Sequence, residues 1–243
     1  MYQSIQHYIT IAACRLLFIG VWWTCKGIIN RVMKVVILGA SSKKSIGYHV
    51  GEHLVAAGHK VVYASRSGKL GLRCDSTNPR QIFGLLKKEK PSVVINAAGV
   101  FLPSVRLGLA RDWKKTEQHL LAKSLGALVV LDAAIAVKGI THFIALGGRE
   151  ISGDPGFAAY TAGNGSLWAL VRFAAKHTRI KTYFIDMPTI EGSTMESKHL
   201  QRMRLTGSRV SVKAEVVTNA VVEILSGKHE SGSRIILGKR GGH

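Results

Sequence analysis

Short apolar runs alternate with longer mixed segments along most of the chain, starting at Met33. Runs that are rich in β-branched residues and too short for a helix are typical of buried parallel strands. They predict strands at 34–38, 60–64, 70–74, 92–99, 141–146, 180–187 and 234–237. The segments between them predict helices, including 112–137, 166–177, 195–205 and 212–225. This alternation predicts one doubly wound α/β domain with a mostly parallel sheet of about seven strands.

Residues 1–32 lie outside this alternation and form an apolar extension without a single acid. A membrane anchor needs about 20 apolar residues, and Arg15 in the middle of this stretch would be costly there. A secretory signal fits poorly, because a positive start region and a clear cleavage site are missing. An organelle presequence also fits poorly, because arginine and serine are scarce in this segment. Two interpretations of residues 1–32 are about equally favoured. In one, translation starts at Met33; in the other, the segment is a helix that docks on a membrane or a partner. We expect residues 33–243 to form the domain, in the cytoplasm, or membrane-associated or organellar through residues 1–32.

A turn of small residues joins the first strand to the first helix. Glycine lets a backbone approach a pyrophosphate closely, and a helix N-terminus offers free N–H groups to phosphate. Strand, small-residue turn, helix and strand therefore predict a dinucleotide site. Its candidate residues are Gly39, Ser41, Ser42, Ser45, Ile46 and Gly47.

Several segments resemble signatures of the short-chain dehydrogenase/reductase family. GASSKKSIG is similar to that family's glycine-rich turn, lengthened as in its divergent enoyl-reductase branch, and NAAG at 96–99 resembles its NNAG signature. CDSTNP resembles the loop whose aspartate contacts the adenine amino group, and MPTIEGST resembles the loop beside the nicotinamide. The resemblance implies a Rossmann-type, NAD(P)-binding fold, with Asp75, Asn96, Ala97, Gly99, Pro188 and Thr189 as further cofactor residues.

Arg66 bears on the choice of cofactor, because it follows the second strand where an acid would bind the ribose of NAD. An arginine there can meet the 2′-phosphate of NADP instead. We therefore expect NADP(H) to be preferred, with NAD possible.

The segment GDPGFAAYTAGN resembles the family's active site, and Tyr160 stands where its proton-donating tyrosine stands. The other positions depart from the family pattern: Asn164 replaces its lysine, Gly147 its serine and Lys123 its asparagine. Lys123 and Asn164 look exchanged, so the Lys123 ammonium is a candidate for the missing cation. Ser152 is a candidate for the missing serine, although its offset from Tyr160 differs. The resemblance implies reduction of a carbonyl or enoyl substrate; the alternative is an inactive cofactor-binding or structural subunit.

Charge and cysteine content narrow the possible partners. The net charge of +20 attracts anions, but the basic residues are dispersed, so a solvated basic surface is favoured over dedicated nucleic-acid or anionic-membrane binding. Three cysteines without a C-x-x-C pair argue for a reducing compartment and against a metal site. We expect a small-molecule substrate and a homo-oligomer.

Overall fold

The computed structural model describes residues 32–99, 113–148, 158–193 and 211–238. Contacts along the chain separate Met1–Val32 from a compact unit, Met33–His243, and only the second is described below. The expected extension therefore lies almost wholly outside the described residues, as do Ser152 and the helix expected at 195–205.

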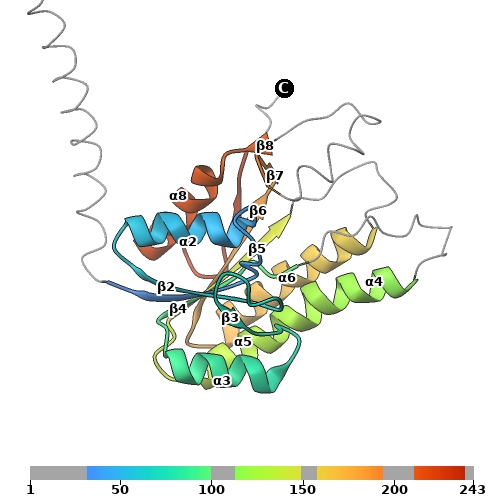
Figure 1. The fold of residues 1–243 in the computed structure, drawn as a ribbon, viewed down its shortest axis with the longest axis horizontal. Coiled ribbons are helices and arrows are strands. Elements are labelled where there is room, and N and C mark those ends of the chain that lie inside the picture. Colours follow the sequence, from blue (N-terminus) through green and yellow to red (C-terminus); the bar gives the residue numbers. More distant parts are fainter. Residues whose placement is uncertain (1–31, 100–112, 149–157, 194–210, 239–243) are drawn as a thin grey trace, which may run out of the picture. The chain divides into compact units, whose positions relative to one another are not determined.

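Seven parallel strands form the main sheet, in the order β3-β2-β1-β4-β5-β6-β9. The expected doubly wound α/β fold is confirmed (Figure 1). The strands are β1 Lys34–Leu38, β2 Lys60–Ser65, β3 Leu72–Arg73, β4 Val93–Asn96, β5 His142–Gly148, β6 Lys181–Met187 and β9 Arg234–Ile236. A separate pair, β7 Thr189–Ile190 and β8 Ser211–Val212, was not expected from the sequence.

Helices cover both faces of the sheet, and their apolar sides form the core. The helices α2 and α8 pack together on one face, while α3, α5 and α6 cover the other (Figure 1). The helices are α2 Ile46–Ala56, α3 Pro79–Glu89, α4 Trp113–Leu120, the π-helix η1 Leu121–Leu125, α5 Gly126–Ala136, α6 Ala158–His177 and α8 Ala214–Leu225.

The expected helix at 112–137 is interrupted by the π-turn η1, with α4 before it and α5 after it. By length and composition Thr116–Ala136 could also cross a membrane. Here it packs on the sheet, where Ala127, Val130 and Ala134 are buried. A π-turn inserts one extra residue per turn, so it changes which side chains face the sheet, and such turns are frequent at functional sites.

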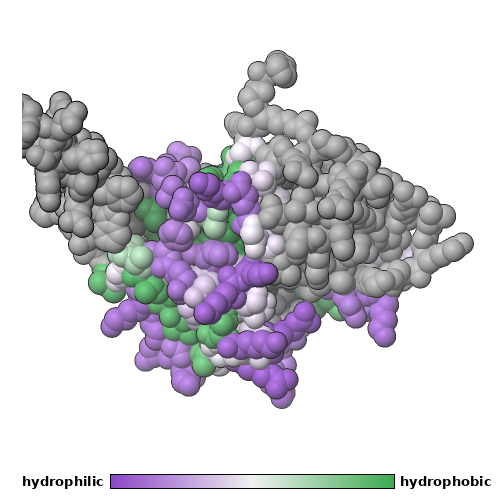
Figure 2. All heavy atoms as spheres, turned by 45° about the horizontal axis from the view of Figure 1, so that its top comes forward, coloured by the Kyte–Doolittle hydropathy of each residue, from purple (hydrophilic) through white to green (hydrophobic). Residues whose placement is uncertain are grey.

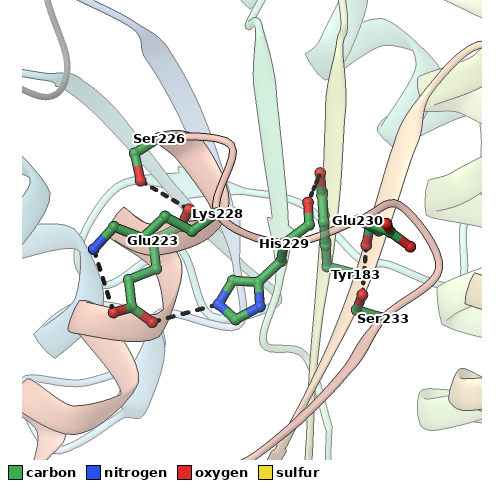
Figure 3. A network of polar contacts seen from close by, with 7 residues as sticks. All are labelled: Tyr183, Glu223, Ser226, Lys228, His229, Glu230 and Ser233. Carbon is green, nitrogen blue, oxygen red and sulfur yellow. Dashed lines mark hydrogen bonds and ion pairs between the residues drawn. The ribbon is translucent and has the colours of Figure 1, made fainter.

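A short polar network fixes the loop that joins α8 to β9 (Figure 3). Glu223 contacts Lys228 at 3.7 Å and His229 at 3.4 Å, and the Tyr183 hydroxyl donates to the His229 carbonyl at 3.4 Å. Ser233 Oγ donates to the Glu230 carbonyl at 2.6 Å, directly before β9 begins. The network therefore sets where the edge strand β9 lies against β6.

Candidate functional site

The strand order reverses between β1 and β4, and the small-residue turn lies at the carboxyl ends of these strands. In open parallel sheets, ligands bind at such a reversal. Gly39 has a φ of +94°, and a Cβ there would lie 2.5 Å from the carbonyl carbon of Ala97. A Cβ on Gly47 would meet Ala97 at 3.3 Å. The two predicted segments, GASSKKSIG and NAAG, are therefore packed together, and glycine is needed where they touch.

The first turn of α2 suits a phosphate. Ser45 precedes the helix, but its hydroxyl donates to the Ser42 carbonyl at 2.6 Å and makes no capping hydrogen bond. No acid lies in the first turn of the helix, and Lys43 and Lys44 are exposed beside it. The dipole and the leading N–H groups of α2 are thus left for an anion, which fits a dinucleotide phosphate. Ser41 is exposed in the same turn, and Ile46 is half-buried.

The other predicted cofactor residues also lie at or just after the carboxyl ends of strands. Arg66 is exposed directly after β2, and Asn96 is buried at the end of β4, where its Oδ1 accepts from the Ala98 N–H at 3.1 Å. Asp75 Oδ1 accepts from the Thr77 N–H at 2.9 Å and from the Thr77 hydroxyl at 2.8 Å, which shapes its loop. Pro188 and Thr189 follow β6 and are half-buried.

Lys123 projects from η1 into the protein, and only 6% of its surface is exposed. Its Nζ donates to the Leu146 carbonyl at 3.2 Å, and its Cε occupies the space that a Cβ on Gly99 would need. Burial lowers the pKa of Lys123 to about 8. The amine therefore lies between NAAG and the end of β5, at the carboxyl ends of the strands, where the predicted cofactor residues also lie.

Tyr160 and Asn164 approach the end of β5 from the first turns of α6. The Tyr160 hydroxyl occupies the space that a Cβ on Gly148 would need. Asn164 Oδ1 accepts from the Gly148 N–H at 3.1 Å, and its Nδ2 donates to the Tyr160 carbonyl at 2.9 Å. Asn164 thus joins α6 to β5, and its role in catalysis stays a prediction.

Burial raises the pKa of Tyr160, a hydrogen bond from the Asn164 side chain opposes the shift, and the negative charge of Asp186 adds to it. Tyr160 is 3% exposed. Its hydroxyl is therefore neutral at ordinary pH, so it can donate a hydrogen bond but resists becoming a base. That the Lys123 ammonium replaces the missing cation stays a prediction.

Gly147 stands where the resemblance places a serine, and the reason for the change is steric. A Cβ there would lie 2.3 Å from Cε2 and 2.4 Å from Cζ of Phe184 on the neighbouring strand β6, which is too close. Restoring the serine therefore requires the Phe184 ring to move.

Two side chains near Tyr160 were missed from the sequence. The ring of His119 lies 5.5 Å from the Tyr160 ring, measured between centroids, and is fully buried. Its position four residues before Lys123, on the same helix, was an available signal. Asp186 is buried in β6, and an acid within the apolar run YFIDMP was a signal too. Among the described residues there is no cluster of potential metal ligands.

Solved structures resemble this fold closely. The protein lin1944 from Listeria innocua matches with a TM-score of 0.69 at 21% identity, over 85% of this chain and 100% of that one. Ligand-free aldohexose dehydrogenase from Thermoplasma acidophilum matches with a TM-score of 0.71 at 18% identity, over 85% and 92%. A small-chain dehydrogenase in complex with NADPH matches with a TM-score of 0.68 at 15% identity, over 85% and 97%. At these identities the likeness shows the fold.

No curated protein sequence matches the chain. The model of the NAD dependent epimerase/dehydratase family matches residues 35–179, which include the glycine-rich turn, NAAG, Lys123 and Tyr160. A match over more than half of the chain shows that this protein belongs to the NAD-dependent epimerase/dehydratase family.

Proposed function

We propose that the protein is an NADP(H)-preferring oxidoreductase that reduces a carbonyl or enoyl substrate, with Tyr160 as proton donor. The observation that carries the proposal is the convergence of Tyr160 and Lys123 at the end of β5, beside NAAG. The nicotinamide of the cofactor supplies the hydride, and the substrate oxygen then needs a proton. A tyrosine that releases a proton becomes an anion, which an ammonium such as that of Lys123 would stabilise.

NADP(H) is supported by the positive charges around the turn. Arg66 after β2 and Lys43 and Lys44 before α2 are exposed, where a 2′-phosphate could meet them. One neighbour in the same fold is a complex with NADPH. Gly39, Gly47, Asn96, Ala97 and Gly99 would line the path of the dinucleotide.

The rival function is an inactive cofactor-binding or structural subunit. Two observations favour it: Tyr160 is 3% exposed, and the ring of Phe184 fills the place of the missing serine. This rival keeps the cofactor site and loses turnover, so the two functions differ in a measurable way.

Turnover over a panel of carbonyl and enoyl compounds, with NADPH and with NADH, tests the proposal. We expect reduction with NADPH that is lost in Tyr160→Phe, while NADPH affinity stays nearly unchanged. Tyr183→Phe is the matched control, because its hydroxyl contacts the His229 carbonyl in the α8–β9 loop. NADPH binding without any turnover would support the inactive subunit instead.

We also propose that the protein forms a homo-oligomer through the helices that cover one face of the sheet. Leu121, Leu125 and Leu128 follow one another at helical spacing and are 40%, 42% and 48% exposed. On the coloured part of the face drawn in Figure 2, groups of apolar side chains lie among polar ones. A row of exposed leucines is typical of a surface that a partner covers. The dispersed basic residues do not favour nucleic acid or an anionic membrane as that partner.

A further inference from the structure

Asp186 is a buried acid within the apolar strand β6, with 1% of its surface exposed. Arg234 of β9 donates to its Oδ2 twice, from Nε at 3.0 Å and from Nη2 at 2.5 Å. The other oxygen, Oδ1, is buried and accepts no hydrogen bond within the part of the chain that the structure describes. Burying a carboxylate with one oxygen unpaired is unfavourable, so the arrangement requires an explanation beyond the ion pair.

The strand register places Asp186 beside the candidate active site. Phe184, two residues earlier on β6, contacts Trp168 of α6 with ring centroids 6.1 Å apart. From this contact, Asp186 is two residues further along β6, and Asn164 is four residues back along α6. Both steps cover roughly 6 to 7 Å. Asp186 therefore lies level with Asn164, which is one helical turn from Tyr160. It also pairs with Gly147, next to the Gly148 that the Tyr160 hydroxyl contacts.

Among the residues that the structure describes, the ionisable groups around Tyr160 come from four elements. Lys123 projects from η1, His119 from α4, Asp186 from β6, and Arg234 from β9 behind Asp186. Asp186 is the negative group among them, and its charge disfavours a second negative charge on Tyr160. Arg234 is 41% exposed at the edge of the sheet, so its own charge is partly screened by water.

We propose that Asp186, held by Arg234, is a positioning residue whose negative charge adds to the effect of burial in keeping the Tyr160 hydroxyl neutral, so that this hydroxyl can donate a hydrogen bond to a substrate oxygen. The contact with a substrate oxygen rests on the proposed function. The effect of the Asp186 charge on Tyr160 is a property of the folded protein and does not depend on any reaction. The network in Figure 3 fixes the loop before β9 and so fixes the starting point of Arg234.

Neutralising the two charges in turn separates this role from a purely structural one. Asp186→Asn removes the negative charge and leaves the Arg234 cation near Tyr160. The double variant Asp186→Asn/Arg234→Gln removes both charges. An electrostatic role predicts that Tyr160 ionises at the lowest pH in Asp186→Asn, at an intermediate pH in the double variant and at the highest pH in the parent. A structural role predicts no such order.

The experiment is a tyrosinate absorbance titration of each protein, with the spectrum of its own Tyr160→Phe version subtracted. We expect Tyr160 to ionise in Asp186→Asn at a pH at least about one unit below that in the parent. Asp132→Asn, which removes an exposed acid from α5, is the control and should titrate like the parent. Identical titrations of the parent and Asp186→Asn would overturn the proposal.

The titration needs no turnover, so it separates this inference from the proposed function. If no variant reduces any substrate, the proposed reaction fails while the titration still decides the role of Asp186. If Asp186→Asn does not fold, the double variant is tested instead, because it leaves neither Asp186 nor Arg234 as an unpaired charge. In that variant Tyr160 must still ionise at a lower pH than in the parent. Failure of both to fold would show that the pair serves folding and would contradict the proposal.

Discussion

Arg66 is the residue on which the choice of cofactor depends. It is exposed after β2, and a charge-assisted contact with a 2′-phosphate is worth about 1.5 to 3 kcal/mol. We expect NADPH to bind more tightly than NADH, and Arg66→Ala to narrow that preference about tenfold or more. Fluorescence titration measures both affinities, and Arg179→Ala, an exposed arginine between α6 and β6, is the control. Equal affinities for the two cofactors in the unmutated protein would contradict the predicted preference for NADP(H).

The buried amine of Lys123 predicts a pH dependence of stability. Its pKa is lowered by burial from the ordinary 10.5 to about 8. Between these values the unfolded chain binds a proton that the folded protein does not, so the free energy of unfolding rises with pH there. The rise from this group is about 3 kcal/mol, and below pH 8 the buried ammonium destabilises the fold throughout.

Lys123→Met keeps the length of the side chain and removes this ionisation. We expect the variant to be more stable than the parent below about pH 8, with the difference shrinking as the pH rises towards 10.5. Denaturant unfolding at several pH values measures it. A difference that does not change with pH would mean that Lys123 is not buried as an ammonium.

The long helix built from α4, η1 and α5 carries both the site and an exposed apolar row. Lys123 faces inward from η1, while Leu121, Leu125 and Leu128 are exposed. We expect Leu125→Arg to shift a homo-oligomer towards monomer, because a charge would be buried in the interface. Light scattering measures the mass, and Val216→Arg on α8, an exposed apolar position on the other face of the sheet, should leave it unchanged. A parent protein that is already monomeric would contradict this assignment.

At the scale of elements, the sequence patterns predicted the seven main strands and most of the helices, because short apolar runs and mixed segments have different periods. The π-turn was not predictable, since LAKSL contains no glycine or proline to mark it. The direction of Lys123 depends on that turn. The β7–β8 pair joins two very short segments distant in sequence, so periodicity could not reveal it.

The candidate site was predictable where it follows local motifs and not where it depends on strand register. Tyr160, the glycine-rich turn and NAAG could be placed from sequence resemblance. The blocking of Gly147 by Phe184 and the pairing of Asp186 with Gly147 arise between β5 and β6, which pair only in the folded sheet.

For the whole molecule, the boundary at Met33 predicts that the domain folds without residues 1–32. Met33 directly precedes β1, and contacts separate Met33–His243 as its own unit. We expect deletion of residues 1–32 to leave the thermal midpoint and the NADPH affinity nearly unchanged. Differential scanning calorimetry and cofactor titration check this. A truncated protein that cannot fold would place the segment in the core.

The central claim is that Lys123 and Tyr160 act together on a substrate beside bound NADPH. The most direct test measures NADPH-dependent reduction and NADPH affinity in the same preparations of the parent, Lys123→Ala and Tyr160→Phe, with the exposed Lys138→Ala as control. We predict that each of the first two variants loses at least about a hundredfold in turnover and keeps its affinity for NADPH, while the control keeps both. Turnover that survives both Tyr160→Phe and Lys123→Ala would contradict the account, even with the fold and the cofactor site correct.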